Sequence, residues 1–436
     1  MLVFWQECKH ILRSRFLWVI LIIGVFVCAF FSASNWDHFR EDFAISHEYV
    51  QKYGTSFTRE DVQKYENYYL EHSKNFKNTK EYFQQAGLGE VSIQEILEAK
   101  QTGEPAEISE KLQKLREDNQ EDYDNYMYQL EILNNLTTIT ESQTNAANTK
   151  KNLKAQISES LQEISFSQWK EDMLIEASSG LYRRVDEIVK NKENLQFFPL
   201  YHFSLINSDW FEIQFGMTGF GLLWAVAFVL AGIIVGRSFG GSFMNHMSEM
   251  IYTGKPGRKI VLHKMASVLS VSTFIYIVIM LVLTAGYVIF LRLDLYWNIP
   301  LASMVSWDGP VIPRIPITVG GYWRFQFGVG LGATLIMALL FSTATLLTKS
   351  FYAGSAISIG FSLLLLGLIV KAPVEQTSLL IMGSPIGLFL NTDKFLQKEF
   401  LFSILPHFEG YSLLAWGGIA VIFAMLGFLR LRRTSL

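Results

Sequence analysis

The chain has 436 residues, of which 50% are apolar, 14% aromatic and only 18% charged, against roughly 25% charged in soluble domains. The net charge of −3 is divided unevenly: residues 35–211 carry 31 acidic and 19 basic side chains, and the remainder carries 9 acidic and 18 basic ones. This pattern excludes an ordinary soluble enzyme, a nucleic-acid-binding protein with a basic face, and a disordered chain.

Apolar runs of about 20 residues are long enough to cross a bilayer as helices. Six runs without Asp, Glu, Lys or Arg have about this length: residues 16–34, 214–236, 265–291, 325–347, 351–370 and 411–429. A seventh run, residues 377–390, is shorter and is interrupted by Gly383, Ser384 and Pro385. We therefore expect an all-α polytopic membrane protein with six transmembrane helices, and a re-entrant segment at 377–390 on the extracellular side.

The first 34 residues form one unit that begins with an amphipathic segment and continues into the first apolar run. Leu2, Val3, Trp5, Ile11 and Leu12 alternate with polar residues in the way of a helix lying on a membrane surface. The run ends in Ser-Ala-Ser, as a secretory signal would, but it exceeds the 7–15 apolar residues typical of a signal core. An amphipathic helix followed by an uncleaved anchor is the favoured interpretation, and a signal peptide is the alternative.

Lysines and arginines close to the apolar runs predict the orientation. With the N-terminus inside, the cytoplasmic flanks hold 12 basic residues, and the short outer loops hold six. Because basic residues concentrate in cytoplasmic loops, both termini are expected in the cytoplasm and the chain in the plasma membrane. Residues 35–211 then lie outside the cell.

The acidic segment 35–211 is predicted to be an extracellular, mainly helical domain. Gly54 and Gly87 are expected to end helices, Ser92 with Glu95 resembles a capping box, and a helical pattern begins at Ala106. Two functions remain open for it. It is either a solvated spacer, or a lid or partner-binding domain above an exit path.

Small and aromatic residues mark the remaining helices. Glycines at 232, 236 and 240, and at 328, 330 and 332, allow close helix approach, either within one chain or between two subunits. Trp297, Trp307, Tyr322 and Trp323 are expected to be aromatic residues at the outer membrane interface.

The sequence contains no recognisable catalytic or metal-binding motif. The eight histidines have no metal-ligand spacing, and the chain contains no Gly-x-x-x-x-Gly-Lys-Ser/Thr phosphate loop. We therefore predict no catalytic, metal or cofactor-binding residues and no enzyme activity. The six runs also lack the ionisable groups that ion-coupled carriers place in the membrane, which disfavours an ion-driven carrier.

Residues 237–264, between the second and third runs, form the most specific segment. It contains Glu249, Gly254, Pro256, Arg258 and Lys264, and a short helix interrupted near Gly254 and Pro256 is expected before the next span. An ordinary positive-inside loop with a turn is an equally good interpretation of these residues alone.

The segment resembles the coupling loop of ATP-binding-cassette (ABC) type-2 permeases, which docks on the ATPase subunit in that family. Trp5, Glu7, Arg13 and Arg15 are similar to the surface "elbow" helix of the same family. The resemblance covers residues 1–34 and 212–436, and it does not reach residues 35–211.

By this resemblance, the chain would be the permease subunit of an ATP-driven exporter of a hydrophobic or amphipathic peptide, drug or lipid. Its partners would be a cytoplasmic ABC ATPase, which binds the ATP, and a second permease subunit. The five loop residues would transmit ATP-driven movement to the spans. The alternative is a membrane-anchored sensor or scaffold that binds a partner through its extracellular domain.

Overall fold

The computed structural model describes residues 2–34, 36–55, 93–102, 104–120, 168–193, 222–244, 255–291, 293–303, 305–306, 309–310, 312–371, 379–390 and 407–433. It also describes isolated residues or short pieces between residues 64 and 91 and between residues 123 and 155.

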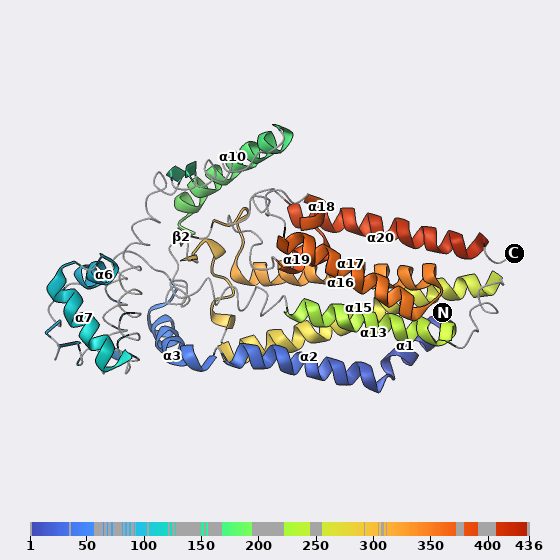
Figure 1. The fold of residues 1–436 in the computed structure, drawn as a ribbon, viewed down its shortest axis with the longest axis horizontal. Coiled ribbons are helices and arrows are strands. Elements are labelled where there is room, and N and C mark those ends of the chain that lie inside the picture. The colour runs from blue at the N-terminus through green and yellow to red at the C-terminus, as the bar shows by residue number, and fades with distance from the viewer. Residues whose placement is uncertain are drawn as a thin grey trace.

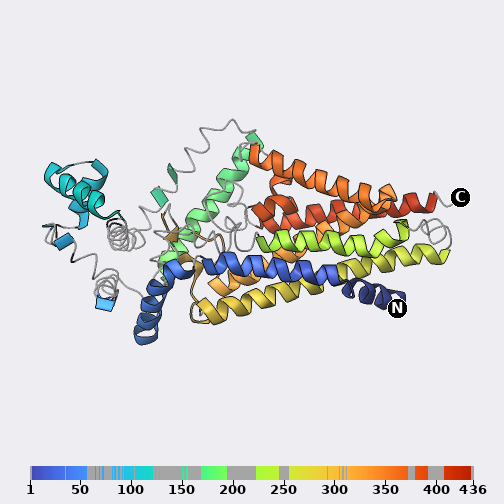
Figure 2. The same ribbon diagram turned by 60° about the horizontal axis from the view of Figure 1, so that its bottom comes forward.

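The described parts of the chain are almost entirely helical (Figures 1 and 2). The longer helices are α1 (Leu2–Leu12), α2 (Arg15–Ser34), α3 (Trp36–Tyr53), α6 (Ile93–Thr102), α7 (Ala106–Asp118), α10 (Gln168–Asn191), α13 (Leu222–Met244), α15 (Lys255–Leu291), α16 (Val319–Thr348), α17 (Phe351–Lys371) and α20 (Phe408–Arg433). Two short helices, α18 (Leu379–Met382) and α19 (Pro385–Leu390), and two 3₁₀ turns, η2 (Leu293–Leu295) and η3 (Leu301–Ser303), complete the helical elements described. Strands β1 (Val305–Ser306) and β2 (Gly309–Pro310) form a minimal antiparallel pair.

Each of the six predicted apolar runs overlaps a helix, namely α2, α13, α15, α16, α17 or α20. Among the described residues, four helices are long and apolar enough to cross a membrane, and a fifth span results if the bent pair α1 and α2 is counted as one. The apolar part of α13, Trp224–Gly240, is shorter. The prediction of an all-α membrane protein is therefore confirmed at the level of four or five candidate spans.

Helix α16 lies at the centre of the bundle. About 61% of its most apolar 18-residue stretch is buried inside the protein, against 22% of the corresponding stretch in α17 and in α20. The outward side chains of α17 and α20 are large and apolar; they include Ile357, Leu363, Leu414 and Ile422. An exterior of this kind is stable in contact with lipid and unstable in water, so the burial pattern agrees with a membrane protein.

Glycine permits the closest approach in the bundle. A Cβ at Gly330 of α16 would overlap the indole nitrogen of Trp224 from α13 and the hydroxyl of Tyr276 from α15. Gly332 faces Leu413 of α20 in the same chain, whereas nothing lies within 4 Å of a Cβ at Gly328. The positions of Gly330 and Gly332 therefore agree with packing within one chain.

The predicted break at residues 383–385 is present. Helices α18 and α19 are separated by Gly383 and Ser384, and the Ser384 hydroxyl accepts a hydrogen bond of 3.0 Å from the Gly387 backbone nitrogen. The indole of Trp416 on α20 donates to the Leu380 carbonyl at 2.8 Å. This broken segment contacts α16, α17 and α20.

The prediction of interfacial aromatic residues is wrong for Tyr322 and Trp323, since both side chains are buried. The Trp323 indole donates to Thr284 of α15 at 2.9 Å. Trp297 packs on Gly320, where a Cβ would overlap its ring. These aromatic side chains therefore join the C-terminal part of α15, and the turn that follows it, to the first turns of α16. Trp307 lies outside the described residues.

Both chain termini lie at one end of the bundle, and α3, α6 and α7 lie beyond the other end (Figures 1 and 2). Helix α3 ends at Tyr53, followed by Gly54 with a φ of +81°, and Gly87 has a φ of +74°, in agreement with the predicted stops. Helices α6 and α7 begin at Ile93 and Ala106, next to the predicted starts. Whether residues 35–211 face the cell exterior remains a prediction.

Candidate functional site

Helix α1 packs one face against α15 and α13. Phe4, Cys8 and Ile11 recur at helical spacing; Cys8 and Ile11 are buried, and Phe4 packs against the same core cluster. Trp5 and Lys9, on other faces of the helix, are exposed. The amphipathic segment therefore forms the predicted helix.

A bend of 56° separates α1 from the first part of α2. The Ser14 hydroxyl accepts a weak hydrogen bond of 3.4 Å from the Leu17 nitrogen at the start of α2. The Trp18 indole donates to the Leu12 carbonyl at 2.7 Å, which satisfies a carbonyl at the end of α1. These contacts fix the angle at which α1 meets α2.

Lys264 forms a junction between three helices. Its side chain on α15 is 7% exposed, and its Nζ lies 3.6 Å from Oε1 of Glu7 on α1. The same Nζ donates to the Ser238 carbonyl of α13 at 2.5 Å and lies 5.8 Å from the centre of the Phe239 ring. A buried ammonium group is tolerated only where such partners replace its water, so this lysine holds α1, α13 and α15 together.

A second contact strengthens the same junction. The Ser267 hydroxyl, one turn further along α15, shares its proton between the His263 carbonyl of its own helix at 2.8 Å and the Phe4 carbonyl of α1 at 3.1 Å. We call the set of Phe4, Glu7, Ser238, Lys264 and Ser267 the inner junction. It lies at the end of the bundle that holds both termini.

Helix α15 extends beyond the predicted third span. The apolar run was expected to begin at Met265, but the helix begins at Lys255 and continues without a break to Leu291. The expected interruption near Pro256 is absent, because proline is compatible with the first turn of a helix. Ten residues at about 1.5 Å each add roughly 15 Å of rigid helix at the inner end.

The structure places the predicted coupling residues as follows. Lys264 lies in the inner junction, and Pro256 and Arg258 lie in the first turn of α15, where only the backbone is described. Glu249 and Gly254 lie outside the described residues. Their role in coupling remains a prediction.

The four predicted elbow residues separate into two groups. Glu7 pairs with Lys264, while Trp5, Arg13 and Arg15 are exposed. Exposed aromatic and basic side chains beside apolar helices are suited to the headgroup region of a membrane. Sequence reasoning selected Glu7 and Lys264 separately and missed Ser238 and Ser267, because backbone-carbonyl and hydroxyl contacts between distant helices have no local signal.

The described residues contain no group of three or more His, Cys, Asp or Glu side chains placed to hold a metal ion. No protein-family model, curated protein or solved structure matches the chain. The inner junction and helix α15, which begins with the basic residues Lys255, Arg258 and Lys259, are the features from which a function is inferred.

Proposed function

We propose that the chain is the permease subunit of an ABC-type exporter. In this proposal six helices cross the plasma membrane, with both termini and residues 245–254 in the cytoplasm and residues 35–211 outside. A separate cytoplasmic ATPase binds and hydrolyses ATP, since this sequence contains no phosphate loop of its own.

The observation that carries the proposal is that the basic residues at the start of α15 and the third predicted span belong to one helix. Arg258 and Lys259 lie on the same uninterrupted helix as the third predicted span. A force applied at the start of α15 would therefore move this span as a rigid body. The Lys264 contacts with Glu7 and Ser238 would carry the same movement to α1 and α13.

Charge supports an acidic partner at this end. Arg237 and Lys259 border the loop between α13 and α15, and both are exposed. Basic residues in a cytoplasmic loop orient the chain and also attract acidic surfaces of a protein partner. In the proposal Glu249, Gly254, Pro256 and Arg258 contact the ATPase, and Lys264 transmits the movement.

The cargo class and the second permease subunit follow from the same proposal. The exposed apolar faces of α17 and α20 offer surfaces for lipid or for another six-helix subunit. Hydrophobic or amphipathic molecules, such as a peptide, a drug or a lipid, are compatible with a path bordered by such faces.

Co-purification tests the proposal. The full chain is extracted from membranes in mild detergent, and co-purifying proteins are identified by mass spectrometry. We expect an ATPase with a Gly-x-x-x-x-Gly-Lys-Ser/Thr motif, and we expect its loss when residues 248–259 are deleted. Glu107→Gln, which changes an exposed ion pair of α7, is the control and should retain the ATPase. Association with a partner that is not an ATPase, and that persists without the loop, would favour a sensor or scaffold.

A further inference from the structure

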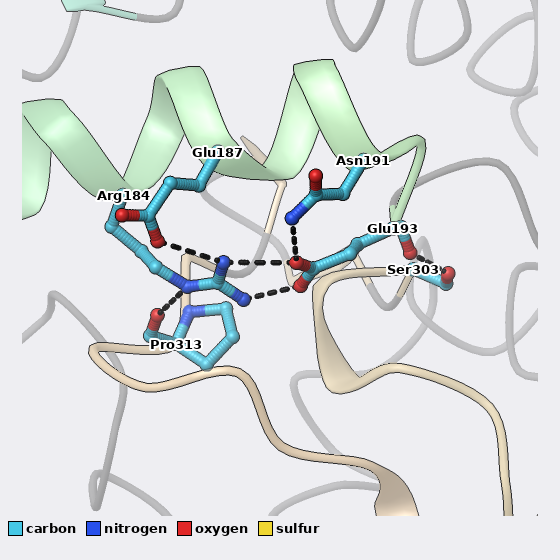
Figure 3. Close-up of polar contacts among 6 residues, drawn as sticks. All are labelled: Arg184, Glu187, Asn191, Glu193, Ser303 and Pro313. Atoms are coloured by element: carbon cyan, nitrogen blue, oxygen red, sulfur yellow. Dashed lines mark hydrogen bonds and ion pairs between the residues drawn. The ribbon is translucent and has the colours of Figure 1, made fainter.

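Helix α10 ends in a turn that brings two charged residues together (Figure 3). Lys192 has a left-handed φ of +54°, and the Glu193 nitrogen donates to the Ile188 carbonyl at 3.0 Å. This is the hydrogen bond of a Schellman turn, which reverses the chain at a helix end. As a result the Glu193 side chain lies beside Arg184, two turns back along α10.

Arg184 is almost completely buried, and its guanidinium group is surrounded by acceptors. Its side chain is 4% exposed, and both terminal nitrogens contact the Glu193 carboxylate, one of them at 3.0 Å. Glu187 lies 3.4 Å away on the same helix, and the Asn191 amide donates to Glu193 at 3.2 Å. A two-pronged arginine–carboxylate contact of this kind fixes the geometry of both partners.

This pair also binds the segment between α15 and α16. The Arg184 Nε donates to the Pro313 carbonyl at 3.3 Å, and the Ser303 hydroxyl donates to the Glu193 carbonyl at 2.5 Å. We call the described residues between 293 and 318 the outer loop. Figure 3 shows Pro313 next to Arg184 and Ser303 next to Glu193.

Apolar burial accompanies these hydrogen bonds. Five apolar side chains are buried but do not belong to the main core cluster. They come from α10 and from the outer loop: Leu181, Val185, Ile188, Ala302 and Ile312. Both α10 and the outer loop therefore bury apolar side chains in addition to the ion pair that joins them.

The outer loop is tied to the bundle by a second buried pair. Arg314 follows Pro313 directly and pairs with Glu409 in the first turn of α20, and these side chains are 7% and 2% exposed. The Leu301 nitrogen donates to the Ile317 carbonyl at 2.8 Å, which closes the loop at the start of α16. Contacts thus run from α10 through Pro313 and Arg314 to α20.

A third contact reaches α3. The Tyr296 hydroxyl lies 3.2 Å from Nδ1 of His47, and the two rings meet edge to face with centres 5.7 Å apart. The outer loop therefore touches both α3, where the acidic segment leaves α2, and α10, which lies near the end of that segment.

We propose that the outer loop is a strut, which holds α3 and α10 in fixed positions on the outer ends of α16 and α20. The base of the acidic segment then moves with those two helices. Without the strut, α10 would lose its contacts with Pro313 and Ser303 and, through Arg314 and Glu409, its connection to α20. The proposal rests on the buried contacts alone and does not require an ATPase partner.

Distance measurements between spin labels test the strut in the full chain. Cys8 and Cys28 are first replaced by serine, and labels are attached to cysteines at Lys190 and Leu414, both exposed, on α10 and α20. We expect one narrow distance distribution in lipid nanodiscs. Arg184→Gln and Arg314→Gln should each broaden it at least twofold. Arg183→Gln, at the exposed neighbouring position, should leave it unchanged.

A second label pair reports on the bundle itself. Labels at Lys9 of α1 and Arg430 of α20, both exposed at the inner end, should keep the same distance in every variant. An unchanged outer distance in Arg184→Gln and Arg314→Gln would overturn the proposal. Simultaneous broadening of the outer and inner distances would also overturn it, because the pairs would then support the whole fold and not a local strut.

Discussion

Lys264 of α15 and Glu7 of α1 form an ion pair of 3.6 Å at the end of the bundle that holds both termini. Because the lysine also donates to the Ser238 carbonyl, one side chain joins three helices. Arg184 has a comparable position at the opposite end, where it joins α10 to the outer loop. The two ends of the bundle are therefore each fixed by a buried cation.

Replacing Lys264 tests the inner junction. Lys264→Met should lower the free energy of unfolding by about 2–4 kcal/mol, since it leaves the half-buried Glu7 carboxylate without its partner. The double variant Glu7→Gln with Lys264→Met should recover part of this loss, which a double-mutant cycle measures as a coupling energy. Thermal unfolding in detergent provides the readout, and Lys9→Met on the exposed face of α1 is the control. Additive effects would show that the two residues do not interact.

Gly330 tests the packing at the bundle centre. Gly330→Ala should destabilise the protein by about 1–3 kcal/mol, because the added Cβ overlaps the side chains of Trp224 and Tyr276. Gly328→Ala, two residues earlier, meets nothing within 4 Å and should be nearly neutral. Equal melting temperatures for the two variants would contradict the arrangement of α13, α15 and α16.

Replacing Trp416 tests how the broken segment, α18 and α19, is attached to α20. Trp416→Phe keeps an aromatic side chain and removes the hydrogen bond to the Leu380 carbonyl, which costs about 1 kcal/mol, and the smaller ring adds a packing loss to this. Hydrogen exchange should become faster in α18 and α19 and remain unchanged in α13. Trp5→Phe, at an exposed position, is the matched control and should not alter exchange in either place.

Lowering the pH should destabilise the contact between α10 and the outer loop. Hydrogen bonds from the Arg184 guanidinium hold the pKa of Glu193 below its ordinary value of 4.5. The contribution of this carboxylate to stability is therefore complete above that value and is lost as the pH falls through the lowered pKa. Between pH 5 and pH 3, the wild-type protein should lose more stability than Glu193→Gln. Parallel losses in the two proteins would contradict this assignment.

Substitutions at Glu249 and Arg258 test the proposed coupling to the ATPase. Glu249→Lys and Arg258→Glu should uncouple ATP hydrolysis by the partner from transport, while the chain still reaches the membrane. Transport of a candidate cargo into inside-out vesicles, measured together with phosphate release, provides the readout. Arg183→Gln on α10 should leave both rates unchanged. Normal transport in the variant with both loop substitutions would remove the basis for assigning these residues.

The spans could be predicted from the sequence because apolar length is a local property of the chain. The runs at 325–347 and 351–370 coincide with α16 and α17 for this reason. The start of α15 could not be predicted in the same way, since a proline that breaks a helix interior is also compatible with a first turn.

The junctions could not be predicted, because their partners are brought together by the fold. Arg314 and Glu409 are 95 positions apart, and Arg184 reaches Pro313 across 129. The Arg184–Glu193 pair is closer in sequence but depends on a left-handed turn at Lys192, a residue type that gives no signal for one. The interfacial interpretation of Tyr322 and Trp323 was wrong for a related reason. Aromatic residues near the end of a span are equally compatible with packing on a neighbouring helix.

Site-specific photo-crosslinking tests the central claim most directly. A benzoylphenylalanine is introduced at Thr253, in the cytoplasmic loop of the proposal, and at Ile315, in the outer loop, and cells are irradiated before membranes are extracted. The account predicts that Thr253 is linked to an ATPase carrying a Gly-x-x-x-x-Gly-Lys-Ser/Thr motif and that Ile315 is not. Full incorporation at Thr253 without a link to any such ATPase would contradict it.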